Sequence, residues 1–255
     1  MKVVILAGGL KSAIDDYDEG IPKPMAEVGE RPILWHIMKY FSSYGLNEFV
    51  ICGGYKLDDI KEYFTDYYLY QSDITVDLST NKVEIHEKRT EDWKVTIADT
   101  GLYSSVGGRV KRVEKYIDGE MFLVVYGDCL SDIDLDSLLA QHKTSGKMAT
   151  ICVARPTGRN RPLAVRDGLL LPDGETDRGG SGAWTDACCM VFNRNIFSCL
   201  PSECDLLEQL QKLAKKDEVG VYRHQGFWMP IETKRDKVYL EELIKKHGAP
   251  WIRWQ

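Results

Sequence analysis

The chain has 255 residues, 44% of them hydrophobic, which suffices for one large domain with a substantial core. Its net charge of −6 argues against nucleic acid or an anionic membrane as general partners, although a local basic patch could hold a phosphorylated ligand. The apolar run at residues 3–7 is too short for a membrane span or a signal peptide. Seven cysteines without a CxxC pair fit reduced thiols, and we expect a cytoplasmic protein.

The first third of the chain alternates strands and helices. An apolar run over residues 3–7 predicts a buried strand that ends in two glycines. Residues 31–45 show helical spacing, residues 48–55 form a second apolar run, and residues 57–70 predict another amphipathic helix. This order predicts an α/β fold with a doubly wound, mostly parallel sheet of Rossmann-like type.

The remaining chain continues this pattern around a small β insertion. Residues 74–97 alternate apolar and polar side chains and predict two strands around Ser-Thr-Asn followed by a further strand, as either a hairpin insertion or an edge of the sheet. The later predicted elements are strands at 121–134 and 147–156, helices at 134–146, 205–220 and 234–248, and a long loop at 156–183. Without a repeat or a linker, residues 1–255 are predicted to form a single domain.

Two segments near the N-terminus suit a phosphate. The glycines Gly8 and Gly9 follow a strand, so backbone N–H groups could approach an anion, although a plain tight turn uses the same pair. Lys23 lies between Pro22 and Pro24, which hold the backbone extended and present the ammonium from a stiff loop. The alternative for Lys23 is a surface position in a proline-rich turn.

Two carboxylates are candidate metal ligands. Asp128 follows a buried strand, where α/β sheets bind ligands, and it comes too early to cap the next helix, a role that Asp132 or Asp134 can fill. Glu232 precedes the last helix and could either join a Mg²⁺ site or cap that helix.

Several segments together resemble the sugar-phosphate nucleotidyltransferases. They are MKVVILAGGL, PKPM, GERPILWHIMKY, DTG with GGRVKRV, YGD and GFWMPIETKRDKVYLEEL. Others, such as HEKRTEDWKVTIADTG and the closing APWIRW, resemble the glucose-1-phosphate cytidylyltransferase branch. The resemblance extends over nearly the whole chain.

This resemblance implies a reaction and a set of site residues. The phosphate of an acceptor attacks the α-phosphorus of CTP and pyrophosphate leaves, with Mg²⁺ as cofactor. Lys23 and Asp128 would be catalytic, Asp128 and Glu232 would bind the metal, and a homo-oligomer is implied. The implied nucleotide-binding residues are Leu6, Ala7, Gly8, Gly9, Lys11, Ser104, Gly108, Arg109 and Gly127.

The chain departs from the family pattern in two regions. In the phosphate loop, Ala13 replaces the family arginine, and an acidic run follows over residues 15–19 that is either a solvated loop or a metal-assisted element. On the acceptor side the sugar-binding motifs are replaced, and we expect the acceptor to be bound instead by Arg159, Arg161, Arg178 and Asp186. Arg166 offers a further cation.

The sequence therefore predicts a cytidylyltransferase that has been retuned toward another phosphorylated acceptor. The resemblance permits another sugar 1-phosphate or a phosphorylated amino-acid amide such as phosphoglutamine, used in surface-polysaccharide modification. The alternative is a catalytically inactive relative that binds nucleotide and has a regulatory or structural role. Retention of Lys23, Asp128 and Glu232 favours the enzyme.

Overall fold

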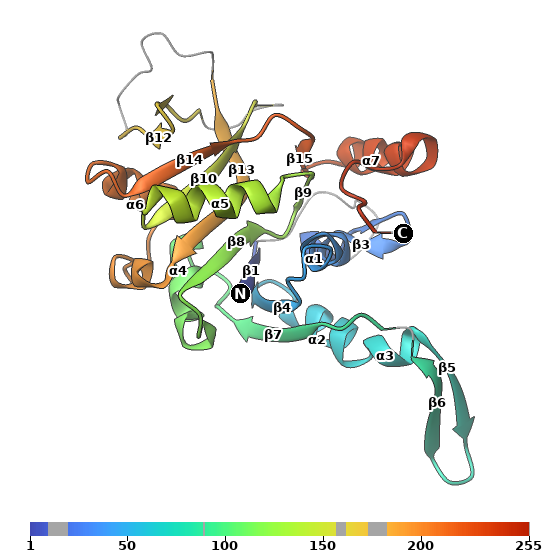
Figure 1. Cartoon of the computed structure of the whole chain (residues 1–255). Coiled ribbons are helices and arrows are strands. Elements are labelled where there is room, and N and C mark those ends of the chain that lie inside the picture. Colours follow the sequence, from blue (N-terminus) through green and yellow to red (C-terminus); the bar gives the residue numbers. More distant parts are fainter. Residues whose placement is uncertain (10–19, 89, 157–161, 173–182, 255) are drawn as a thin grey trace.

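The computed structural model describes residues 1–9, 20–88, 90–156, 162–172 and 183–254 (Figure 1). It confirms the predicted α/β fold. One nine-stranded sheet has the order β11-β12-β14-β10-β13-β8-β1-β4-β7. Its strands are β1 (Lys2–Ala7), β4 (Glu48–Gly53), β7 (Lys94–Asp99), β8 (Met121–Tyr126), β10 (Ala149–Ala154), β11 (Val165–Arg166), β12 (Leu169–Leu170), β13 (Thr185–Asn193) and β14 (Val219–Arg223).

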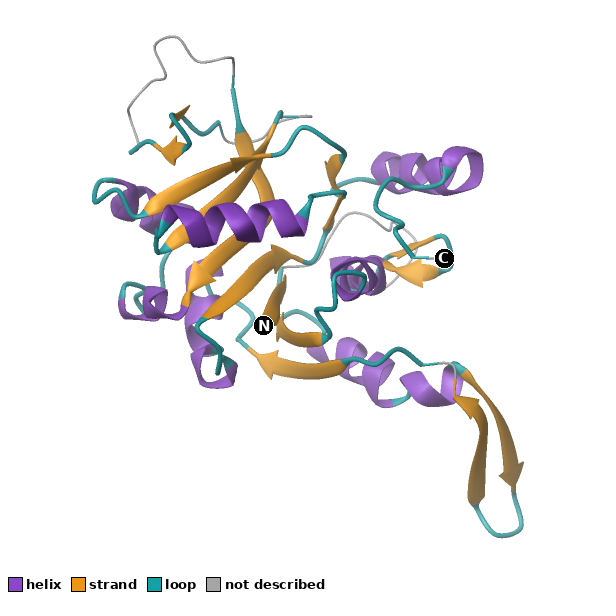
Figure 2. Cartoon of the chain, viewed as in Figure 1, coloured by secondary structure: helices purple, strands orange, loops and turns teal. Residues whose placement is uncertain are grey.

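Helices cover both faces of this sheet (Figure 2). The described α-helices are α1 (Ile33–Ser42), α2 (Leu57–Thr65), α3 (Tyr67–Tyr70), α4 (Val106–Arg112), α5 (Leu135–Ser145), α6 (Leu206–Ala214) and α7 (Lys234–His247), of which α3 lies beside the hairpin rather than on the main sheet. Along β1, Val3 and Ile5 belong to the core on one face and Val4 to the core on the other. This burial on both faces explains why β1 reads as a continuous apolar run. None of the described helices is long and apolar enough to cross a membrane.

The strand directions create a switch point beside β1. Strands β7, β4, β1 and β8 are parallel neighbours, so the chain passes from β1 to β4 on one side and β8 lies on the other. Strand β13 runs antiparallel to both β8 and β10, and β14 is parallel to β10. The carboxyl ends of β1, β8, β10 and β14 therefore share one edge of the sheet, where open α/β sheets bind their ligands.

The predicted β insertion is a hairpin that extends away from the body of the molecule (Figure 1). It consists of β5 (Ser72–Asp77) and β6 (Lys82–Lys88), which form a separate two-stranded sheet. Ile74 pairs with Ile85 and Val76 pairs with Val83, so one face of the ribbon is apolar. Ile74 and Val76 are nevertheless exposed, and the next strand, β7, returns to the edge of the main sheet.

Helix α4 is an element that the sequence patterns did not predict. It contains Gly107 and Gly108, which weaken a helix, but Ser105 caps it by accepting a hydrogen bond from the Gly108 N–H at 3.2 Å. Both glycines are required by packing. A Cβ would lie 2.3 Å from Cys204 Sγ at Gly107 and 2.6 Å from Glu203 Oε2 at Gly108.

Of the two residues expected to cap α5, the structure selects Asp134. Its side chain accepts a hydrogen bond from the Ser137 N–H. The predicted helix at 57–70 is divided at Asp66 into α2 and α3.

Candidate active site

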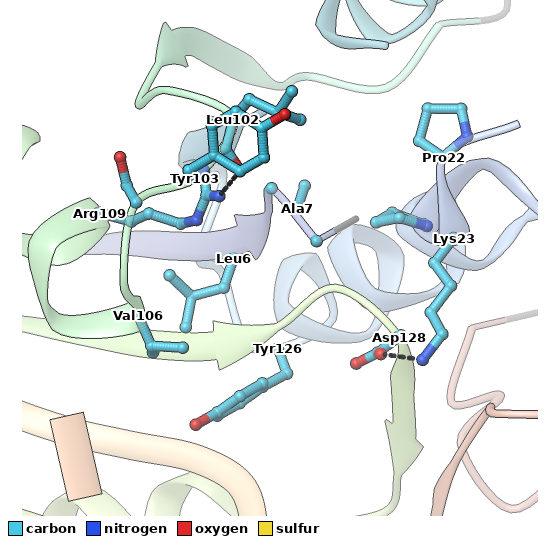
Figure 3. Close-up of a pocket in the computed structure, with 14 residues that line it drawn as sticks. Leu6, Ala7, Pro22, Lys23, Leu102, Tyr103, Val106, Arg109, Tyr126 and Asp128 are labelled. Atoms are coloured by element: carbon cyan, nitrogen blue, oxygen red, sulfur yellow. Dashed lines mark hydrogen bonds and ion pairs between the residues drawn. The ribbon is translucent and has the colours of Figure 1, made fainter. Parts of the chain in front are cut away.

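A cleft of about 320 Å³ opens at the switch point between β1 and β8 (Figure 3). It lies beyond the carboxyl ends of these strands and brings together four separate segments of the chain. The lining residues are Leu6, Ala7, Gly8, Gly9, Pro22, Lys23, Pro24, Leu102, Tyr103, Ser104, Val106, Arg109, Tyr126 and Asp128. Eight of the predicted site residues are thus brought to one cleft: Leu6, Ala7, Gly8, Gly9, Lys23, Ser104, Arg109 and Asp128.

Lys23 and Asp128 form an ion pair in this cleft. Lys23 begins the 3₁₀ turn η1 (Lys23–Met25), and Asp128 follows β8. The Lys23 Nζ atom donates to Asp128 Oδ2 at 3.0 Å, and each side chain keeps 29% of its surface exposed (Figure 3). The pair is therefore accessible to a ligand, to which the lysine can offer a positive charge and the aspartate two oxygen ligands.

The turn before Asp128 is fixed against β1. The Gly127 N–H donates to the Leu6 carbonyl at 3.0 Å, and a Cβ at Gly127 would lie 2.9 Å from that oxygen. Gly127 thus lies beside the cleft and positions Asp128. Gly108 does not line the cleft, and its close neighbour is Glu203.

Arg109 has a structural role in the wall of the cleft. Its side chain is buried, and Nη1 donates to the Thr100 hydroxyl at 2.9 Å and to the Gly101 carbonyl at 2.7 Å, while Nη2 donates to the Leu102 carbonyl at 3.0 Å. Burial lowers the pKa of this guanidinium. Arg109 thereby holds the loop that carries the lining residues Leu102 and Tyr103.

The buried guanidinium also explains the first glycine of the loop. A Cβ on Gly8 would lie 2.1 Å from Arg109 Nη1, whereas among the described residues no atom lies within 4 Å of a Cβ on Gly9. Gly8 is therefore required by the close approach of Arg109 to the backbone.

A second small sheet brings the segment that contains Glu232 next to Asp128. Strand β15 (Trp228–Pro230) pairs with β9 (Cys129–Ser131), and the Ile231 N–H donates to the Asp128 carbonyl at 2.8 Å. The cap of α7 is formed by Thr233 and Asp236, which exchange hydrogen bonds in a capping box. The alternative role for Glu232, capping this helix with its own side chain, is thus filled by its neighbours.

Asp186 lies on β13 behind the cleft residue Tyr126. Its carboxylate accepts hydrogen bonds from the Tyr126 hydroxyl and, at 2.8 Å, from the Cys188 N–H. Cys188 has a φ of +61°, at a bulge in the pairing of β13 with β10. Burial raises the pKa of Asp186 to about 7. Lys11, Arg159, Arg161, Arg178 and the acidic run at 15–19 lie outside the described residues.

We expect the replacement Asp186→Asn to stabilise the protein in a pH-dependent manner. Because the pKa is raised above 3.8 in the folded state, folding binds a proton between about pH 4 and 7, and the wild type loses stability as the pH rises through this window. The shift corresponds to at most about 4 kcal/mol above pH 7. Denaturant unfolding at pH 5 and pH 8 should show a larger gain for the variant at pH 8. An equal effect at both pH values would contradict the raised pKa.

An open sheet with a glycine turn, a lysine and a carboxylate at its switch point is typical of nucleotide-binding α/β proteins. The Nucleotidyl transferase family model matches residues 2–162. The chain therefore belongs to the nucleotidyl transferase family, and it is a nucleotidyltransferase.

Similar proteins extend this family assignment over the whole chain. Glucose-1-phosphate cytidylyltransferase of Salmonella typhimurium is 44% identical over 100% of both chains, and the probable glucose-1-phosphate cytidylyltransferase of Bacillus subtilis is 36% identical over 100% of both. Among solved structures, HddC from Yersinia pseudotuberculosis with GMP-PN has a TM-score of 0.71, with 21% identity over 94% of this chain and 98% of that one. UDP-glucose pyrophosphorylase from Acinetobacter baumannii has a TM-score of 0.74, with 18% identity over 98% and 95%. These two structures support the fold.

Several lining residues were not identified from the sequence. Leu102, Tyr103, Val106 and Tyr126 come from a loop, from α4 and from the end of β8. Apolar and aromatic side chains in these positions carry no signature that separates a cleft wall from the core. Only Tyr126 had a signal in the sequence, because it directly precedes Gly127 and Asp128, which were predicted to belong to the site.

Proposed function

We propose that this nucleotidyltransferase transfers CMP from CTP to a small phosphorylated acceptor and releases pyrophosphate. The observation that carries the proposal is the Lys23–Asp128 pair, 3.0 Å apart beside the glycine turn at the switch point. The choice of CTP is supported by the full-length similarity to proteins named as glucose-1-phosphate cytidylyltransferases. In this proposal Gly8 and Gly9 present backbone to the triphosphate, and Lys23 stabilises its negative charge.

The donor set fits Mg²⁺, which Asp128 and Glu232 would hold. Asp128 is half-buried at the cleft, and the Ile231–Asp128 backbone hydrogen bond brings the chain of Glu232 alongside it. One or two carboxylates with phosphate oxygens are the usual ligands of Mg²⁺ in nucleotide sites. Bound there, the cation would neutralise charge on the phosphates. When substrate enters, the Lys23 ammonium would exchange its contact with Asp128 for one with phosphate.

The acceptor is proposed to differ from plain glucose 1-phosphate. The replacement of the family's sugar-binding motifs supports this difference. So does Asp186, whose carboxylate is hydrogen-bonded to the hydroxyl of the cleft residue Tyr126. The candidates are another sugar 1-phosphate or a phosphorylated amino-acid amide such as phosphoglutamine, with a role in surface-polysaccharide modification. Asp186 would accept from an amine or hydroxyl of this acceptor.

Pyrophosphate release tests both parts of the proposal. The protein with Mg²⁺ is assayed with CTP, UTP, dTTP, ATP and GTP against sugar 1-phosphates and phosphorylated amino-acid amides. Turnover with CTP and an acceptor other than glucose 1-phosphate is expected. Turnover with glucose 1-phosphate alone would refute the proposal of an altered acceptor, but it would still support cytidylyl transfer from CTP. Release with no pair, together with intact CTP binding, would favour the inactive relative.

A further inference from the structure

Two exposed arginines are held over one buried indole ring. Trp184 is only 3% exposed. The Arg155 guanidinium carbon lies 4.0 Å from the centre of the Trp184 ring, and that of Arg223 lies 5.6 Å from it. Arg155 Nη1 also donates to the Ala183 carbonyl at 3.2 Å. The fold thus gathers two cationic groups at one place on the surface.

These arginines lie at the same edge of the sheet as the cleft. Arg223 is the last residue of β14, and Arg155 directly follows β10. Both strands run in the direction of β8, after which Asp128 lies. Strand β10 is separated from β8 by β13 alone. Two inter-strand spacings place the end of β10 about 10 Å from the end of β8.

We infer that Arg155 and Arg223 bind a carboxylate of the acceptor that is distinct from the phosphate that reacts beside Lys23 and Asp128. This inference rests on the proposed function and names the class of its acceptor: small molecules with a phosphate at one end and a carboxylate about 10 Å away or somewhat less. Glucose 1-phosphate has no such second anionic group.

The geometry suits a carboxylate for a physical reason. An arginine that stacks on an aromatic face keeps its N–H donors in the plane of the guanidinium, where they match the two oxygens of a carboxylate. Stacking also restricts the rotamers of a long side chain, so less entropy is lost when the anion binds.

The test measures binding with a matched pair of probes. L-glutamine phosphorylated on its side-chain amide is compared with the same compound whose α-carboxylate is a carboxamide, and glucose 1-phosphate is the third probe. Each is titrated calorimetrically into protein saturated with Mg²⁺ and a non-hydrolysable CTP analogue. The wild type should bind the carboxylate probe about tenfold to a hundredfold more tightly than the carboxamide.

The variants Arg155→Gln and Arg223→Gln should each lose most of this preference. Arg194→Gln is the matched control, because Arg194 is an exposed arginine at the opposite edge of the same sheet, directly after β13. It should retain the full preference. The wild type and the three variants should have similar melting temperatures, since the replaced arginine side chains are exposed.

Four results would overturn the inference. No preference in the wild type, or a preference that survives in both variants, would mean that the arginines only stack on Trp184. An equal loss of affinity for all three probes would place the reacting phosphate on the arginines. Binding of glucose 1-phosphate alone would refute the carboxylate acceptor, while pyrophosphate release with that sugar would still support cytidylyl transfer.

Discussion

Replacement of Asp128 by asparagine should lower the kcat of pyrophosphate release about a thousandfold. The carboxylate lies beyond β8 in the cleft, 3.0 Å from Lys23 Nζ, and in the proposed reaction it holds the cation that neutralises the phosphates. Asparagine keeps the shape of the side chain and removes its charge. Because the ion pair is partly exposed, its loss should cost about 1 kcal/mol of stability or less, so the melting temperature should change by only about 2–4 °C.

Asp118→Asn provides the control for this experiment. Asp118 forms an ion pair with Lys2 at 2.8 Å, but it is 78% exposed and lies before β8, away from the cleft. Its replacement should leave turnover within about twofold of the wild type. If Asp128→Asn also retained wild-type turnover, the carboxylate would have no part in the reaction.

Replacement of Gly8 by alanine should destabilise the protein and abolish most of its nucleotide binding. The new Cβ would lie 2.1 Å from Arg109 Nη1. The guanidinium cannot yield cheaply, because it is buried and donates to Thr100, Gly101 and Leu102. Overpacking together with strained hydrogen bonds should cost about 3 kcal/mol, which corresponds to a fall of about 6–12 °C in melting temperature.

Gly9→Ala is the matched control for stability, since its Cβ would meet no atom within 4 Å in the part of the chain that the structure describes. Its free energy of unfolding should stay within about 0.5 kcal/mol of the wild type. A double-mutant cycle with Arg109→Met then tests the cause. The cost of Gly8→Ala should largely disappear when the guanidinium is absent, and additive effects would show that the clash is not the origin of the loss.

Strong local patterns made much of the fold predictable. The apolar runs of β1, β4 and β8 and the alternation of β5 and β6 predicted strands where the structure has them. Helix α4 was not predicted because its two glycines disfavour a helix locally. These glycines are needed because Cys204 and Glu203, from a distant part of the chain, pack closely against them. Such long-range packing leaves no periodic trace in the sequence.

The candidate site was predictable where a residue type has a distinctive chemistry. Lys23 between prolines and Asp128 after a strand were identified in this way, and the structure brings them into contact. The pairing of Arg155 and Arg223 was not identified, because Arg155 follows β10 and Arg223 ends β14, and the fold brings the two together over the Trp184 ring. The same holds for the contact of Asp186 with Tyr126.

The buried position of Arg109 changes how a mutational survey of this protein should be interpreted. A screen that scores activity alone would rank Arg109 with Lys23 and Asp128, although its guanidinium serves the carbonyls of its own chain. A parallel measurement of protein abundance would separate them. Substitutions at Arg109 should reduce activity and abundance together, whereas those at Lys23 and Asp128 should reduce activity at nearly normal abundance.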